Sequence, residues 1–166
     1  MTVYVASPLG FAVAGREFYY RRLLPALRRG GHVVLDPWQS AASAAIERVR
    51  RRPYGRARRD ALAAANTRAA RANQEAIDRA DAVVAVLDGA DVDSGTAAEI
   101  GYAFARGKRI VGYRGDVRLA GDNEGAVVNL QVEYFIRASG GTIVTRLSAL
   151  PRALRSAGVS PSRRTR

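Results

Sequence analysis

An acidic, glycine-containing loop directly follows the most apolar run of this chain. The run is residues 82–87, and the loop contains Asp88, Asp91 and Asp93. A short apolar run bounded by turn residues is typical of a buried strand, and the composition of residues 94–106 predicts a helix. The loop therefore joins the carboxyl end of a strand to the amino end of a helix, which is where open α/β sheets bind ligands.

Asp93 and Glu99 are the two carboxylates that such a strand, loop and helix would bring into one crevice. Asp93 suits the position before the helix, where a side-chain oxygen accepts hydrogen bonds from unpaired backbone N–H groups. Glu99 lies four residues after Gly95, and helical side chains lean toward the amino end, so its carboxylate should lie over a turn that glycine leaves open. Two carboxyl groups in one crevice have their pKa values pushed apart, which allows one to act as a nucleophile and the other as an acid.

Residues 93–101, Asp-Ser-Gly-Thr-Ala-Ala-Glu-Ile-Gly, resemble a loop of the nucleoside 2-deoxyribosyltransferase family, which has the form D-x-G-x-x-x-E-x-G. Three other segments are similar to the same family and occur in its order: residues 3–11, 73–81 and 128–131. The likeness extends over residues 2–147. The chain departs from the family at Asn73, where some members carry an aspartate, so we expect a hydrogen-bonding role there and no acid/base role.

The resemblance implies an activity and a role for four of these residues. Members of the family transfer a 2-deoxyribosyl group between nucleobases through a covalent intermediate on the loop glutamate, and no cofactor or metal is required. Glu99 would be this nucleophile, Tyr4 would orient it, and Asp93 would contact the base and supply or relay a proton. Asn129 would contact the sugar in the adjacent subunit, which implies a homo-oligomer that takes a nucleoside and a free nucleobase.

The other candidate substrate-binding residues follow the predicted strands or flank them. The complete set is Ser7, Phe11, Asp36, Trp38, Asn73, Asp88, Gly95, Asn129 and Gln131. Phe11 is placed to stack on a nucleobase, and Trp38 beside Asp36 is placed to contact ligand at the carboxyl edge of the sheet. A purely structural role stays open for Tyr4 as a core residue, and for Asn129 as a helix cap.

Composition narrows the chemistry further. The 166 residues are 48% hydrophobic and include no cysteine and one histidine, which fits one domain and excludes disulfides, thiolate catalysis and the usual zinc sites. No apolar run reaches the ~20 residues needed to cross a bilayer, so we expect a cytoplasmic enzyme without a membrane partner. We expect the domain to span residues 1–157 and a basic, disordered tail to follow at 158–166.

The chain is strongly basic, with 27 lysine and arginine residues, 15 acidic residues and a net charge of +12. Nine arginines lie between Arg48 and Arg71, which fits either a solvated helix face or a surface for phosphate or nucleic acid. The general bias toward arginine and alanine favours the solvated face, so nucleic acid is not an expected partner. The acidic loop should also repel a phosphate, unless arginines of the first helix, such as Arg16 or Arg22, enter the site.

Strand and helix patterns alternate along the chain. Strands are predicted at residues 2–6, 32–35, 82–87, 109–113 and 142–144, and the main helices at 16–29, on both sides of a break at 53–55, and at 94–106. This alternation predicts an α/β fold, a single-domain, doubly wound parallel sheet of five strands that is flavodoxin-like or Rossmann-like, in the order 2-1-3-4-5. The dinucleotide motif G-x-G-x-x-G and a P-loop are both missing, which argues against the usual dinucleotide folds and excludes Walker-type NTPases.

The expected function is thus transfer of a 2-deoxyribosyl group between nucleobases by cleavage of an N-glycosidic bond. Two alternatives stay open. One is a nucleoside or deoxynucleoside 5′-monophosphate N-glycosidase, in which water accepts the sugar. The other is a noncatalytic module that binds nucleotides or nucleic acid through the basic helix.

Overall fold

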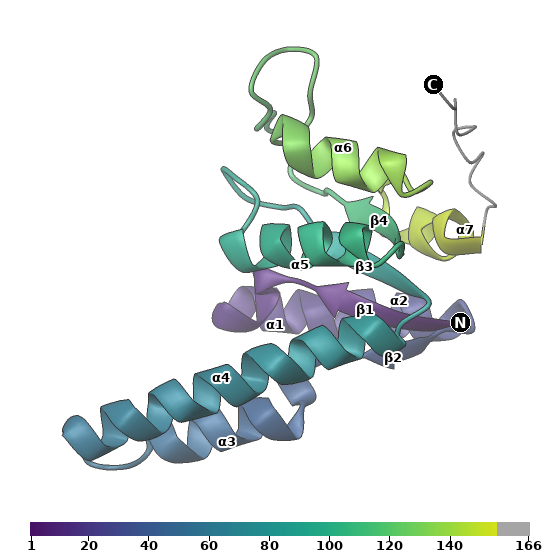
Figure 1. Ribbon diagram of the computed structural model, residues 1–166. Coiled ribbons are helices and arrows are strands. Elements are labelled where there is room, and N and C mark those ends of the chain that lie inside the picture. The colour runs from purple at the N-terminus through teal and green to yellow at the C-terminus, as the bar shows by residue number, and fades with distance from the viewer. Residues whose placement is uncertain (156–166) are drawn as a thin grey trace.

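The computed structural model describes residues 1–155 and contains a parallel sheet with helices on both faces (Figure 1). The strands are β1 (Thr2–Ala6), β2 (Val33–Leu35), β3 (Ala82–Val86), β4 (Arg109–Tyr113) and β5 (Ile143–Val144). Their order is β2-β1-β3-β4-β5, and all neighbouring pairs are parallel. The predicted α/β class and strand order are therefore confirmed, although β2, β3 and β5 are each one residue shorter than predicted. The boundary and tail expected at 157–166 lie outside the described residues.

The helices are α1 (Val13–Phe18), α2 (Leu24–Arg29), α3 (Ala41–Arg50), α4 (Arg56–Arg79), α5 (Ser94–Ala105), α6 (Leu130–Ala138) and α7 (Leu150–Arg155). The helix predicted at 16–29 begins earlier, at Val13, and a π-helical segment, Tyr19–Leu23, joins α1 to α2. Pro25 supplies a physical reason for this irregularity. It has no backbone N–H to donate to the carbonyl of Arg21, so the regular hydrogen-bond ladder is interrupted there.

Side chains of β1 alternate between two apolar cores. Val3 and Val5 pack in the core that includes residues of the α1–α2 segment and α7, whereas Tyr4 and Ala6 pack in the core shared with α4, α5 and α6. Successive side chains of a strand point to opposite faces of the sheet. This register turns Tyr4 toward α5, the helix that carries Glu99.

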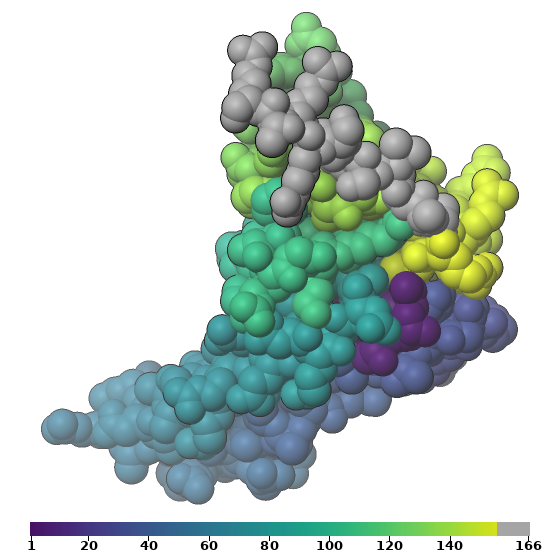
Figure 2. Space-filling model, turned by 45° about the vertical axis from the view of Figure 1, so that its right-hand side comes forward, coloured from purple at the N-terminus to yellow at the C-terminus, as the bar shows by residue number. Residues whose placement is uncertain are grey.

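Helices α3 and α4 pack against each other as a hairpin, and the break predicted at residues 53–55 is the turn between them. Pro53 cannot continue α3, because proline lacks the backbone N–H that a helix interior uses. The hairpin projects away from the rest of the molecule, as both views show (Figures 1 and 2). Ser43 and Glu47 on α3 and Asn66 and Asn73 on α4 line one cavity, so the inner face of the hairpin helps to enclose the site.

Candidate active site

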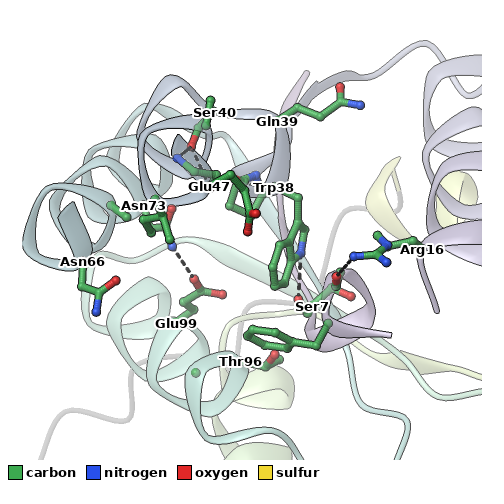
Figure 3. A pocket seen from close by; sticks show the side chains of 18 of the residues that line it. Ser7, Arg16, Trp38, Gln39, Ser40, Glu47, Asn66, Asn73, Thr96 and Glu99 are labelled. Atoms are coloured by element: carbon green, nitrogen blue, oxygen red, sulfur yellow. Dashed lines mark hydrogen bonds between the residues drawn. The ribbon is translucent and has the colours of Figure 1, made fainter. Parts of the chain in front are cut away.

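The Glu99 carboxylate lies where three separate elements meet (Figure 3). The Tyr4 hydroxyl on β1 donates a hydrogen bond of 2.6 Å to Glu99 Oε1. The Asn73 side-chain amide on α4 donates to the same oxygen at 3.3 Å. The two donors hold one carboxylate oxygen and leave Oε2 without a hydrogen bond from residues 1–155. The other oxygen is thus available to a ligand.

Burial governs the charge state of this carboxyl. It raises the pKa of Glu99 from its ordinary value of 4.5 to about 7, against the hydrogen bond from Tyr4, which lowers it. The negative charge of Asp93 raises the pKa further, and the Asn73 amide lowers it. Glu99 consequently changes its charge near neutral pH, which is the range in which a catalytic carboxyl is useful.

Asp93 ends the loop after β3 and caps α5. Its Oδ2 accepts hydrogen bonds from the backbone N–H of Thr96 at 2.9 Å and from the Thr96 hydroxyl at 3.2 Å. The side chain also lines the cavity that contains Glu99. Gly95 belongs to this turn, and a Cβ there would lie 3.1 Å from Asp93 Oδ2. A larger residue at Gly95 would therefore crowd the capping carboxylate.

Two aromatic rings form one wall of the cavity. Phe11, at the end of a 3-10 turn after β1, meets Trp38 edge to face, with ring centroids 4.7 Å apart. The Trp38 indole N–H donates to the carbonyl of Ser7 at 3.1 Å, which fixes the ring against the first loop. Gly10 permits this contact, since a Cβ there would lie 2.1 Å from the indole. Phe11 is 76% exposed, so its ring is open to a ligand.

Asp36 supports the aromatic wall from behind and does not line the cavity. Its Oδ1 accepts hydrogen bonds from the Tyr19 hydroxyl and from the backbone N–H of Trp38, both at 2.9 Å. Burial raises the pKa of this carboxyl. The structure therefore gives Asp36 a positioning contact to Trp38, whereas the sequence suggested a contact to substrate.

The cavity has a volume of about 760 Å³ and is open to solvent on one side. It brings together five sequence candidates besides Glu99 and Asp93, namely Ser7, Phe11, Trp38, Asn73 and Gly95. Several polar residues that line the cavity were not among the candidates from the sequence: Tyr20, Gln39, Ser40, Ser43, Glu47, Arg50 and Asn66. One signal was available for Asn66, which lies seven residues before Asn73 on α4. This spacing of two helical turns places both amides on one face.

Asp88, Asn129 and Gln131 lie outside this cavity in the single chain. The Asp88 carboxylate accepts backbone hydrogen bonds from Gly115 at 2.6 Å and Asp116 at 2.9 Å, so it ties the loop after β3 to the loop after β4. Asn129 caps α6 through a bond of 3.0 Å from the backbone of Gln131. These residues have structural contacts here, and a contact to substrate would require a second subunit for Asn129 and Gln131.

The acidic loop contributes less to the cavity than the sequence predicts, because Asp93 lines it and Asp88 and Asp91 do not. Arg16 on α1 and Arg50 on α3 both line the cavity. The Arg16 guanidinium donates to the carbonyl of Gly10 at 3.3 Å, which holds it beside the first loop. An arginine of the first helix thus enters the site, which is the condition under which the sequence leaves room for a phosphate.

The fold and site define a class of protein: a doubly wound α/β protein with a half-buried glutamate beside an aromatic wall at the carboxyl edge of the sheet. The sequence model of the nucleoside 2-deoxyribosyltransferases matches residues 3–131, and the chain belongs to this family. No curated protein matches the chain in sequence. Within residues 1–155, no helix is long and apolar enough to span a membrane.

Several solved structures share the fold. A conserved protein from Enterococcus faecalis V583 has a TM-score of 0.65 and 24% identity, over 93% of this chain and 97% of its own. A 2-deoxyribosyltransferase from Bacillus psychrosaccharolyticus has a TM-score of 0.63 and 20% identity, over 91% and 90% of the two chains. The CMP N-glycosidase BcmB from Clostridium botulinum has a TM-score of 0.54 and 16% identity, over 94% and 100%.

Proposed function

We propose that this protein cleaves the N-glycosidic bond of a 2′-deoxynucleoside and transfers the deoxyribosyl group to a second nucleobase. The observation that carries the proposal is the arrangement at Glu99. One carboxylate oxygen is held by Tyr4 and Asn73, and the side chain lines a cavity with room for a nucleoside. A fixed carboxylate at a reacting sugar stabilises positive charge and can trap the sugar covalently.

The reaction follows in two displacements. In the first, a Glu99 oxygen forms a bond to the anomeric carbon, the bond from this carbon to the base nitrogen breaks, and the electron pair stays on the nitrogen. The departing base takes up a proton, which Asp93 relays from water. In the second, a nitrogen of the acceptor base attacks the same carbon, Glu99 leaves as a carboxylate, and the acceptor passes its proton through Asp93 to water. Two inversions retain the configuration.

The aromatic wall supplies the binding surface for the base. Phe11 and Trp38 present apolar rings at the cavity, and offset stacking on such rings is favourable for any planar base. Asn73 and Asn66 offer amide donors and acceptors from α4 on another side of the cavity. A neutral nucleoside therefore finds both stacking and hydrogen-bonding partners beside Glu99.

A second candidate function is hydrolysis of a nucleoside 5′-monophosphate, with water as the acceptor. The specific observation that favours it is the presence of Arg16 and Arg50 at the cavity, since guanidinium groups bind phosphate well. One solved structure with the same fold is a CMP N-glycosidase. The same Glu99 chemistry would serve both reactions, with water replacing the second base.

The deciding experiment supplies a 2′-deoxynucleoside together with an isotope-labelled free base. We expect the label to appear in a new β-nucleoside faster than free deoxyribose accumulates, and slower hydrolysis to persist without an acceptor. Parallel reactions with the 5′-monophosphate and with an Arg16→Gln variant measure the contribution of phosphate binding. Release of base only from the monophosphate, lost in Arg16→Gln and never accompanied by label incorporation, would establish the hydrolase instead.

A further inference from the structure

The tip of the α3–α4 hairpin, defined here as residues 47–60, concentrates positive charge on a small surface. It contains seven arginines and only two acidic residues, Glu47 and Asp60. Each acidic residue is paired within the tip, Glu47 with Arg50 at 2.9 Å and Asp60 with Arg56 at 3.8 Å. The remaining five arginines form no ion pair within residues 1–155: Arg48, Arg51, Arg52, Arg58 and Arg59.

This charge is displayed away from the body of the molecule. The hairpin projects away from the sheet, and its turn forms the outer end of the projection (Figure 1). Arg48, Arg51, Arg52 and Arg59 are all exposed. At physiological ionic strength, exposed charges interact over about 8 Å, so the scattered acidic residues of the body screen the tip weakly. The tip is therefore a localised patch of positive charge.

A flat aromatic ring lies at the centre of this charge. Tyr54, in the turn between the helices, is 81% exposed. The guanidinium carbons of Arg58 and Arg59 lie 5.7 Å and 6.0 Å from the centre of its ring. An exposed ring of this size is costly to leave in water and offers a stacking surface. Proteins that bind single-stranded nucleic acid combine aromatic rings that stack on bases with positively charged side chains that contact the phosphates.

We propose that the tip of the α3–α4 hairpin binds single-stranded nucleic acid, with Tyr54 stacking on an unpaired base and the surrounding arginines contacting the backbone phosphates. A duplex fits less well, because its bases are stacked on one another and offer no face to Tyr54. A membrane surface fits less well, because the tip has no large exposed apolar side chain besides this tyrosine. The tip of a second copy carries the same seven arginines, so two tips repel each other. The proposal is independent of the reaction proposed for Glu99.

The test measures the fluorescence anisotropy of labelled 20-nucleotide DNA and RNA strands, and of the matching duplex, as salt is raised. The tip variant carries Arg51→Ala, Arg52→Ala and Arg59→Ala. The control carries Arg29→Ala, Arg146→Ala and Arg152→Ala, which remove the same charge from exposed arginines outside the hairpin. None of these six residues lines the cavity. Circular dichroism and thermal unfolding verify that the variants fold.

We expect the wild-type protein and the control to bind both single strands more tightly than the duplex. Each lost phosphate contact reduces the slope of log affinity against log salt by about 0.7, so the tip variant should lose about 2 from this slope. Tyr54→Ala should weaken single-strand binding roughly tenfold, the order expected for one stacked base, and Tyr54→Phe should restore it. Equal losses in tip variant and control, preference for duplex, or no binding at low salt would each overturn the proposal.

Discussion

At the scale of single residues, the site depends on Glu99, a carboxylate whose ionised form is destabilised by burial. Glu99 gives up most of its contact with water and receives two hydrogen bonds on one oxygen. Burying an ionised group is unfavourable unless partners compensate, and here the compensation is incomplete because the pKa rises to about 7. A carboxylate of this kind is a stronger nucleophile than a solvated one, and it lowers the stability of the folded protein.

Replacing Glu99 by glutamine should separate these two effects. Turnover should fall by several orders of magnitude, because a neutral amide neither attacks the anomeric carbon nor stabilises a cationic sugar. Between pH 4.5 and 7 the native state binds more protons than the unfolded state, so wild-type stability falls as pH rises through this window. The stability of the glutamine variant does not fall in this way, because its side chain does not ionise. We expect its stability relative to wild type to improve by at most about 3 kcal/mol between pH 4 and pH 8.

Urea unfolding of both proteins at several pH values measures this difference. Circular dichroism of the variant supplies the control for an intact fold. A Glu99→Gln protein that folds and retains near-normal turnover would exclude Glu99 as the nucleophile, and a pH-independent stability difference would mean that Glu99 does not titrate near neutrality.

Tyr4 should set the pH at which Glu99 becomes active. Its hydroxyl lowers the pKa of Glu99, so Tyr4→Phe should raise that pKa and move the rising limb of kcat/KM to higher pH. The phenylalanine ring keeps the apolar packing of β1, which makes this a conservative test. A pH–rate profile measured on both proteins distinguishes this role from a core role, since a mere packing defect would lower kcat/KM without moving its pH dependence.

At the scale of elements, the loop after β3 and the first turn of α5 act as one unit. Asp93 caps the helix and lines the cavity at the same time, so a variant must distinguish the two contributions. Asparagine is as good a cap as aspartate, whereas alanine loses about 1 kcal/mol. Asp93→Asn therefore removes the carboxylate with little effect on α5.

We expect Asp93→Asn to retain stability and to lose activity most with poor leaving bases, because those bases need a proton as they depart. Asp93→Ala should show the same dependence and a lower unfolding temperature. Rates measured over a series of deoxynucleosides with different bases test this. An equal loss for good and poor leaving bases would assign Asp93 to the helix cap alone.

At the scale of the whole molecule, a single chain leaves its cavity open on one side and exposes large apolar side chains. Phe11 at the cavity is 76% exposed, and Leu130 and Tyr134 on α6 are 54% and 58% exposed. Asn129 precedes the same helix and does not line the cavity of its own chain. We therefore predict an active dimer or larger assembly, in which Asn129 completes the site of a neighbour.

Mixing two inactive variants tests this assembly. Glu99→Ala and Asn129→Ser, the latter chosen because serine keeps the cap of α6, should each be impaired alone. A random mixture of dimers contains one intact site in each mixed dimer, so about a quarter of the wild-type activity should return. Each variant measured alone at the same total concentration is the control. Activity that equals the simple sum of the two would show that sites are not shared.

The sequence by itself determined the elements, the strand order and the central motif. Alternating apolar strands and amphipathic helices leave few ways to build a parallel sheet, because crossovers are right-handed and both faces must be covered. The spacing from Asp93 to Glu99 is local, within one loop and its helix, and local geometry is set by helical periodicity. The chance of error was greatest at strand ends and at Pro25, where hydrogen bonding within the fold decides the outcome.

Only the tertiary structure decided which side chains meet. Tyr4 and Glu99 are 95 residues apart, and they touch because the register of β1 turns Tyr4 toward α5. Asp88 accepts hydrogen bonds from the backbone of Gly115 and Asp116, which no sequence pattern connects to it. The entry of Arg16 and Arg50 into the cavity depends on how α1 and α3 are rotated about their axes. Such contacts join residues far apart in the chain, and the packing of whole elements fixes them.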